Sequence, residues 1–317
     1  MGEINNAMNE YMSDATRFAD FFNGVMFAGK EVIKPEELSD ASEKYDQNLV
    51  VNPKTKERVK AVERIRDIKM RHIDGTCLRI LGIEGQNYID YACGVRSVEY
   101  DVMEYRSQIK HLNSDITKTK NGLTKSELLS GMKKEDRLSP TYTIWFYYGD
   151  EPYDGPRLLS DMMFFPEDDV FRKYFSDYKI NVICLNEIED MNVFHTELRK
   201  LFKLIKYKNE RDTMRELLEN DNDFDTISED TLYTMSVVLE KPHLWDERDK
   251  FLRKESGVKY TMCRAFEEAE EEAAIKAENR FAALINKLLT LGKNDDVLRV
   301  TTDPEYRKEL YTQYGLK

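Results

Sequence analysis

Two carboxylates, Asp67 and Glu84, lie on either side of an Asp74-Gly75 dipeptide, each beside an apolar run. Asp-Gly is typical of a tight hairpin turn, so folding the chain back there brings Asp67 and Glu84 side by side. Two carboxylates at the end of a sheet form a hard-oxygen site for a divalent ion such as Mg²⁺. Such an ion activates water and stabilises charge on a phosphoryl group. The pattern therefore indicates metal-assisted phosphoryl chemistry, with Asp67 and Glu84 as the metal ligands.

The spacing alone is not specific, because 60 of the 317 residues are Asp or Glu. The alternative is a solvated carboxylate at position 67 and a turn-flanking one at position 84. The neighbouring residues favour a site. Residues 77–83 read as a mostly buried strand, and Glu84 comes at its end. Since carboxylates are rarely buried without a partner, we expect Glu84 to have one.

Five sequence blocks, taken together and in order, resemble the Rpn family of recombination-promoting nucleases and putative transposases. The likeness is to the YhgA-like branch of the PD-(D/E)xK nuclease superfamily, and it spans roughly residues 8–240. The blocks are Arg17–Gly24 with Val32–Leu38, Glu63–Ile68, Ile80–Gln86, Ser130–Arg137 and Tyr148–Arg157. Jointly they are far more specific than the spacing of the two carboxylates.

The resemblance implies a restriction-endonuclease-like mixed sheet flanked by helices, and a Mg²⁺-dependent DNA endonuclease, with Mn²⁺ as a substitute, linked to recombination or mobile elements. Asp67 and Glu84 would hold the metal, with the Gly85 carbonyl as a further ligand. Gln86 takes the position of the catalytic lysine. Glutamine is neither a cation nor a useful base, so its role would be to orient water by hydrogen bonding.

Three further residues have both a functional and a structural interpretation. Asp20 is a candidate third acid, because related folds often place one on the first helix; the alternative is an acidic residue on the helix surface. Arg96 and Tyr100 follow the site on a predicted helix. They could meet a phosphate, or equally form a salt bridge and pack in the core.

Apolar periodicity predicts an α/β protein with an all-α C-terminal region. We expect a domain over residues 1–208 and a helical region over 209–317. The predicted helices are 8–27, 94–112 and several after residue 190, and residues 39–56 read as a loop. On the helix over 94–112 the apolar residues are Val95, Val98, Val102, Tyr105 and Ile109. The predicted strands are 62–72, 76–84, 141–148 and 179–185, which suggests a mixed, partly parallel sheet.

The net charge of −12 and the pI of about 5.1 count against a DNA-binding protein, because phosphate contacts require Lys and Arg. They do not exclude one, since residues 54–71 and 199–208 are basic and could line a groove. Solvated faces are the alternative for these runs. The acidic surface also keeps a second function open, that of a non-catalytic descendant of the nuclease fold that serves as a binding or oligomeric scaffold.

Residues 258–291 carry apolar side chains at gaps of three and four, with Gly292 as a stop, which predicts one long helix. Its alanine-rich stripe, from Met262 to Leu291, would pack on other helices after residue 190 or on a second copy in a homodimer. No apolar run reaches the roughly 18 residues of a membrane span, and residues 1–14 lack a signal-peptide core. We therefore expect a cytoplasmic protein.

Overall fold

The computed structural model describes residues 2–41, 67–75, 77–119, 122–220, 224, 226–253, 259–260 and 262–316. It divides into two compact units. The first comprises Met1–Met214 with Val237–Glu240, and the second comprises Arg215–Ser236 with Lys241–Lys317. Most of the predicted loop over 39–56 and of the basic run over 54–71 lies outside the described residues.

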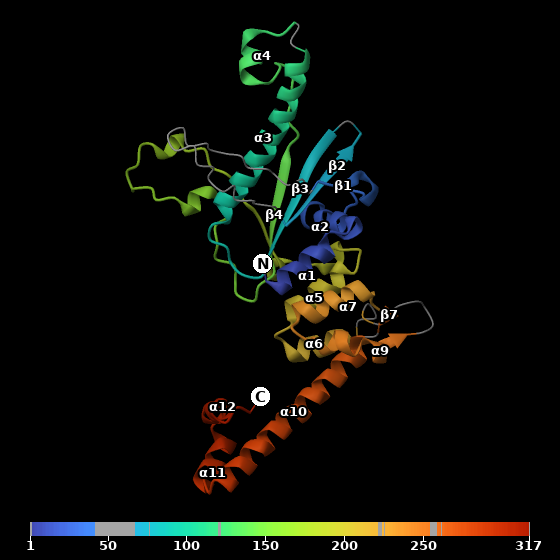
Figure 1. Ribbon diagram of the computed structural model, residues 1–317, viewed down its shortest axis with the longest axis vertical. Coiled ribbons are helices and arrows are strands. Elements are labelled where there is room, and N and C mark those ends of the chain that lie inside the picture. The colour runs from blue at the N-terminus through green and yellow to red at the C-terminus, as the bar shows by residue number, and fades with distance from the viewer. Residues whose placement is uncertain are drawn as a thin grey trace. The chain divides into compact units, whose positions relative to one another are not determined.

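The first unit is built on a five-stranded mixed sheet flanked by helices, so the predicted mixed α/β class is confirmed (Figure 1). The strand order is β1-β2-β3-β4-β5. The first two pairings are antiparallel and the last two are parallel. The strands are β1 (Leu38–Asp40), β2 (Ile68–Asp74), β3 (Cys77–Gln86), β4 (Thr141–Tyr147) and β5 (Asn181–Cys184).

The hairpin between β2 and β3 turns where the sequence predicts. Asp74 pairs with Cys77, and Gly75 has a φ of 57°, a left-handed conformation that favours glycine. The register runs from Asp74 opposite Cys77 to Ile68 opposite Ile83. Residue 67 follows next to residue 84, so the turn brings the two candidate metal ligands together. The short strand β1, which falls partly in the predicted loop, pairs along the outer edge of β2.

One face of the sheet is covered by helices with aromatic side chains. These helices are α1 (Glu3–Met12), α2 (Ala15–Phe27) and α5 (Leu198–Tyr207). Phe146 of β4 contacts Phe21 of α2 and Phe202 of α5, with ring centroids 4.9 and 5.0 Å apart. The predicted single helix over 8–27 is two helices, because Asp14 caps a new one by accepting hydrogen bonds from the N–H groups of Thr16 and Arg17.

The opposite face is covered by α3 (Cys93–Thr119), which Figure 1 shows running along the sheet. The predicted apolar face of this helix is only partly right, because Val98, Tyr105 and Ile109 are half-buried. Val95 and Val102 are 50% and 47% exposed, whereas Ser97, Asp101 and Glu104 are buried. The helix thus turns a mixed face toward the sheet, on which these polar residues lie beside the buried Tyr100 and Met103.

Two rows of α3 residues meet two parts of the sheet. In the first row, Ser97 accepts a hydrogen bond from the Trp145 indole at 2.6 Å, and Asp101 accepts one from the Thr143 hydroxyl at 3.3 Å. The neighbouring row begins at Arg96 and includes Glu104, which forms an ion pair with Lys69 of β2 at 3.3 Å. The first row holds β4, and the second holds the β2–β3 hairpin.

Smaller elements complete the first unit. They are the helix α4 (Lys125–Ser130) and the short 3-10 turns at Pro35–Glu37, Leu159–Met162, Arg172–Tyr174, Leu185–Glu187 and Met191–Val193. The basic residues of α5 are engaged structurally. Lys206 donates to the Ile188 carbonyl at 2.5 Å, and Lys208, just after the helix, pairs with Asp150 at 2.9 Å. These two lysines of the run over 199–208 are thus bound within the fold, which neither a basic groove nor a solvated face predicts.

The rest of the chain is helical apart from a small two-stranded sheet. Helix α6 (Arg211–Asn220) spans the division between the units. The other elements are α7 (Glu229–Val238), α8 (His243–Asp246), α9 (Arg248–Phe251), β6 (Leu252–Arg253), β7 (Lys259–Tyr260), α10 (Met262–Thr290), α11 (Asn294–Thr302) and α12 (Pro304–Gln313). In the described part of the chain no helix is both long and apolar enough to cross a membrane.

The predicted long helix is present as α10, but its stripe is buried only near the C-terminal end. Leu284 and Leu288 form a small core with Val300 of α11 and Leu310 of α12. Ala277 and Leu291, by contrast, are exposed. The side chains of the stripe from Met262 to Ala273 lie outside the described residues. Intramolecular docking therefore accounts for the last turns of the stripe, and a homodimer stays a prediction.

The hydrogen bond between Ser97 of α3 and Trp145 of β4 can be tested by mutation. Ser97→Ala should lower the free energy of unfolding by about 1–3 kcal/mol, because it leaves the buried Trp145 N–H without its acceptor. Val102→Ala on the same helix should change it by no more than about 0.5 kcal/mol, since Val102 is exposed. Urea denaturation of both variants measures the difference. A larger loss for Val102→Ala would contradict the polar interface.

Candidate functional site

Asp67 and Glu84 are joined by two hydrogen bonds that cross between the strands. The Asp67 N–H donates to Glu84 Oε1 at 3.2 Å, and the Gly85 N–H donates to Asp67 Oδ2 at 3.2 Å. The chain at Asp67 thus continues the register of the β2–β3 hairpin. These contacts place the two residues next to each other, as the sequence analysis expects.

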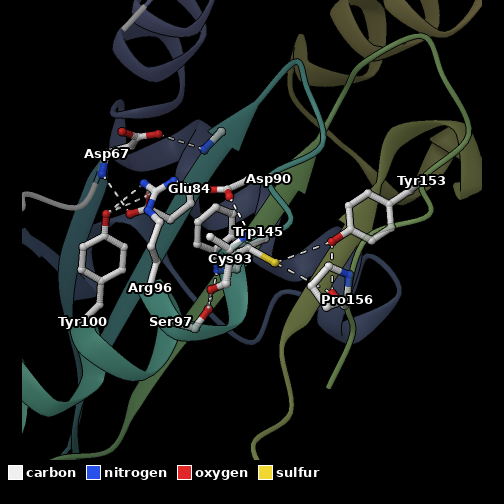
Figure 2. A network of polar contacts seen from close by, with 12 residues as sticks. Asp67, Glu84, Asp90, Cys93, Arg96, Ser97, Tyr100, Trp145, Tyr153 and Pro156 are labelled. Carbon is white, nitrogen blue, oxygen red and sulfur yellow. Dashed lines mark hydrogen bonds and ion pairs between the residues drawn. The ribbon is translucent and has the colours of Figure 1, made fainter. Parts of the chain in front are cut away.

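Glu84 is fully buried, and its charge is balanced by an arginine. Arg96 of α3 donates to Glu84 Oε2 at 3.1 Å, and the Tyr100 hydroxyl lies 3.4 Å from the same oxygen (Figure 2). Burial and the charge of Glu84 raise the pKa of Tyr100, so its hydroxyl remains protonated. Glu84 therefore has the partner that its burial requires, and in the structure this partner is a guanidinium.

Arg96 links Glu84 to a third carboxylate. Its other terminal nitrogen, Nη1, contacts Asp90 Oδ2 at 2.5 Å, and its guanidinium lies 4.8 Å from the centre of the Trp145 ring. Asp90 also accepts from the Ala92 N–H at 2.8 Å, just before α3 begins. The sequence analysis does not include Asp90. Its only signal is that of an acidic residue before a helix, which points to a cap and not to Glu84.

The Asp67 carboxylate is less well compensated than that of Glu84. Burial raises its pKa, against hydrogen bonds from Asn9 and the Gly85 N–H that lower it. Its Oδ1 is buried and has no hydrogen-bond partner among the described residues. A buried anionic oxygen without a donor is costly, and a cation is one way to satisfy it. The donor chemistry here fits a hard divalent ion.

Gln86 lies two residues beyond Glu84, on the same face of β3. Its side chain is buried, and its Oε1 has no hydrogen-bond partner among the described residues. Gln86 also lines a cavity of about 10 Å³ with Asp90 and Tyr147, which is close to the space that one water molecule needs. An amide oxygen can accept a hydrogen bond from water, and the expected role of Gln86 in orienting water stays a prediction.

Asp20 binds the chain just before α5 and not the other candidate site residues. Its carboxylate accepts hydrogen bonds from the N–H groups of His195 and Thr196, at 2.9 and 2.8 Å, and from the Thr196 hydroxyl at 2.6 Å. These contacts tie α2 to the chain that enters α5. In the described part of the chain the contacts of Asp20 include none with Asp67 or Glu84. We therefore assign Asp20 a structural role and remove it from the candidate catalytic set.

A loop is attached to the start of α3 beside the ion pairs. The Cys93 thiol lies 3.7 Å from the Tyr153 hydroxyl and 3.8 Å from the Pro156 carbonyl oxygen (Figure 2). Burial raises the pKa of Cys93, so the thiol is protonated and a poor nucleophile. Cys93 thus has a packing role.

The site has two carboxylates from the hairpin and one, Asp90, that Arg96 connects to them. Among the residues that the structure describes, no group of three or more His, Cys, Asp or Glu side chains has the arrangement of a metal site. The hairpin and Gln86 lie where the sequence predicts, Asp20 does not join them, and Arg96 has the salt-bridge role that the sequence analysis left open.

Neutralising Asp67 and neutralising Glu84 should have different effects on the stability of the protein. Asp67→Asn should leave the melting temperature at pH 7, measured in EDTA, unchanged or higher, because burial penalises the charged form. Since the folded-state pKa is raised, stability falls as pH rises through it, and any gain in Asp67→Asn should disappear at lower pH. Glu84→Gln should cost about 2 kcal/mol, because it removes the charged acceptor of Arg96. Equal losses in both variants would contradict this division.

Comparisons with known proteins identify no relative with which this site can be compared. A scan against protein-family models and searches of curated proteins and of solved structures found no match.

Proposed function

We propose that this protein is a metal-dependent DNA endonuclease of the PD-(D/E)xK type, with a restriction-endonuclease-like core, and that it acts in recombination or on mobile elements. The observation that carries the proposal is the pairing of Asp67 with Glu84 across the β2–β3 hairpin, with Gln86 two residues further along β3. The order of these residues agrees with the family pattern that the sequence resembles.

Asp67 and Glu84 would hold a Mg²⁺ ion, and Mn²⁺ would be a substitute. The Asp67 Oδ1 without a donor and the excess of carboxylates over Arg96 support this assignment. When bound, the ion would supply Lewis acidity and a more acidic water. Gln86 would orient the attacking water through its Oε1. Arg96 already contacts Asp90, so it can keep a charged partner when Glu84 is released.

A second function is favoured by one observation. Arg96 neutralises Glu84 in the structure, so the charge of this buried carboxylate is balanced without a metal. If Arg96 never releases Glu84, the protein is a non-catalytic descendant of the nuclease fold that acts as a binding or oligomeric scaffold. The two functions differ in divalent-ion binding, which calorimetry of the full chain measures directly.

The nuclease proposal predicts that plasmid nicking requires Mg²⁺ or Mn²⁺ and falls by at least about 100-fold in Asp67→Asn and in Glu84→Gln. Asp74→Asn is the matched control, since Asp74 is an exposed carboxylate on the same hairpin. It should cleave as the wild type does. Nicking that survives in both site variants, or that EDTA does not stop, would contradict the assignment. Absence of both cleavage and divalent-ion binding would favour the scaffold.

DNA binding by the full chain should be weak and should fall steeply with salt. A net charge of −12 leaves few basic residues to contact phosphates, and salt screens those contacts. Fluorescence anisotropy with labelled duplex DNA between about 50 and 200 mM salt measures the slope. An affinity that stays constant over this range would argue against phosphate recognition.

A further inference from the structure

Helix α1 places two asparagine side chains against the end of the sheet where Asp67 and Glu84 lie (Figure 1). Asn5 and Asn9 are four residues apart, so they lie on the same side of the helix, one turn from each other. Asn5 is buried and accepts a hydrogen bond from the Tyr148 hydroxyl at 2.7 Å. This bond attaches α1 to the residue that follows β4, and Asn9 points in the same direction one turn further along the helix.

The Asn9 side chain forms a hydrogen bond with the Asp67 carboxylate. Since an ionised carboxylate only accepts hydrogen bonds, the amide nitrogen of Asn9 is the donor. The Gly85 N–H donates to Oδ2 of the same carboxylate at 3.2 Å. Two donors, one from α1 and one from β3, therefore fix the Asp67 side chain. Its Oδ1 remains without a hydrogen-bond partner among the described residues.

The absence of a side chain at residue 85 makes room for Asn9. A Cβ atom on Gly85 would lie 2.7 Å from Asn9 Oδ1, which is too close for a carbon and an oxygen atom that are not bonded to each other. The next residue that it would meet is Tyr148, whose Cε1 would be 3.6 Å away, an ordinary contact. Gly85 does not have a positive φ, so alanine is compatible with the backbone there. Gly85→Ala would therefore displace the end of the Asn9 side chain and little else.

Asn9 stands in the position of a group that orients a metal ligand. It contacts the Asp67 carboxylate, and Oδ1 of that carboxylate has no donor in the part of the chain that the structure describes. A ligand that is fixed before the ion arrives loses less conformational entropy when the ion binds. Loss of a group that hydrogen-bonds to a ligating side chain typically weakens metal binding by about 10- to 100-fold.

We propose that Asn9 is a positioning residue for Asp67, which holds the carboxylate so that Oδ1 is left for the divalent ion. Gly85 contributes by leaving the space that the Asn9 side chain occupies. This role rests on the proposed function, since it concerns the same metal. Asn9 lies outside the five sequence blocks that resemble the nuclease family, so the resemblance does not assign it.

The first measurement tests the contact in the absence of metal. Asn9→Ala removes the amide, and Asn6→Ala is the matched control, because Asn6 is an exposed asparagine of the same helix and the two changes alter helix propensity similarly. In EDTA, Asn9→Ala should melt about 2–4 °C below Asn6→Ala, as expected for the loss of one hydrogen bond to a charged group. The two variants should melt at the same temperature when each is combined with Asp67→Ala.

The second measurement is calorimetric titration of the full chain with Mn²⁺. Asn6→Ala should bind Mn²⁺ as the wild type does, whereas Asn9→Ala should bind it at least about 10-fold more weakly. Gly85→Ala keeps Asn9 in the chain but displaces its side chain, so it should weaken Mn²⁺ binding to a similar extent. Saturating Mn²⁺ should restore plasmid nicking by Asn9→Ala to the wild-type rate, which a folding defect would not allow.

The outcomes separate this role from the nuclease proposal. Equal Mn²⁺ affinities in Asn9→Ala and Asn6→Ala, with nicking by both, would overturn the role of Asn9 and leave the nuclease. A difference in melting temperature that persists in the Asp67→Ala background would show that Asn9 acts through another residue, and would also overturn the role. Absence of Mn²⁺ binding by the wild type would overturn the nuclease together with this role, and the difference in melting temperature in EDTA would then identify the Asn9–Asp67 contact as purely structural.

Discussion

The spacing of side chains along α3 matches the spacing of residues along the strands beneath it, and this match sets the geometry of the first unit. Four residues of an α-helix rise about 6 Å, and two residues of a strand rise nearly 7 Å. Side chains at every fourth position of α3 can therefore meet alternate residues of the strands. Ser97 and Asp101 meet Trp145 and Thr143 in this way. Because these groups are buried and polar, each needs its partner, and the helix has little freedom to slide.

The row of α3 that includes Arg96 and Glu104 connects the helix to both strands of the β2–β3 hairpin. Arg96 balances Glu84, and Glu104 balances Lys69. Both pairs cross from the helix to the hairpin, so one interface holds Glu84 of the site and Lys69 of β2. Removing one member of such a pair leaves a buried charge, which costs more than the pair itself contributes. The polar interface thus links the stability of the fold to the charge of Glu84 in the candidate site.

Whether Arg96 stays bound to Glu84 or releases it distinguishes the two proposed functions. Its contact with Asp90 gives it a second anionic partner, so the release of Glu84 need not leave an isolated guanidinium. Asp67, by contrast, has an oxygen without a donor and a pKa raised by burial. The arrangement combines one satisfied and one unsatisfied carboxylate. The unsatisfied one is where a cation would contribute most.

The sequence by itself determined the local features: the Asp-Gly turn, the strands on either side of it, the adjacency of Asp67 to Glu84, and the need of Glu84 for a partner. These follow from turn chemistry and strand period, which act over a few residues. Only the tertiary structure decided that Arg96 is that partner, that α3 buries Ser97, Asp101 and Glu104, and that Asp20 caps the chain before α5. A polar residue on a helix reads as solvent-facing until the opposing surface is known, because its burial is favourable only where a distant segment supplies the complementary hydrogen bond or charge.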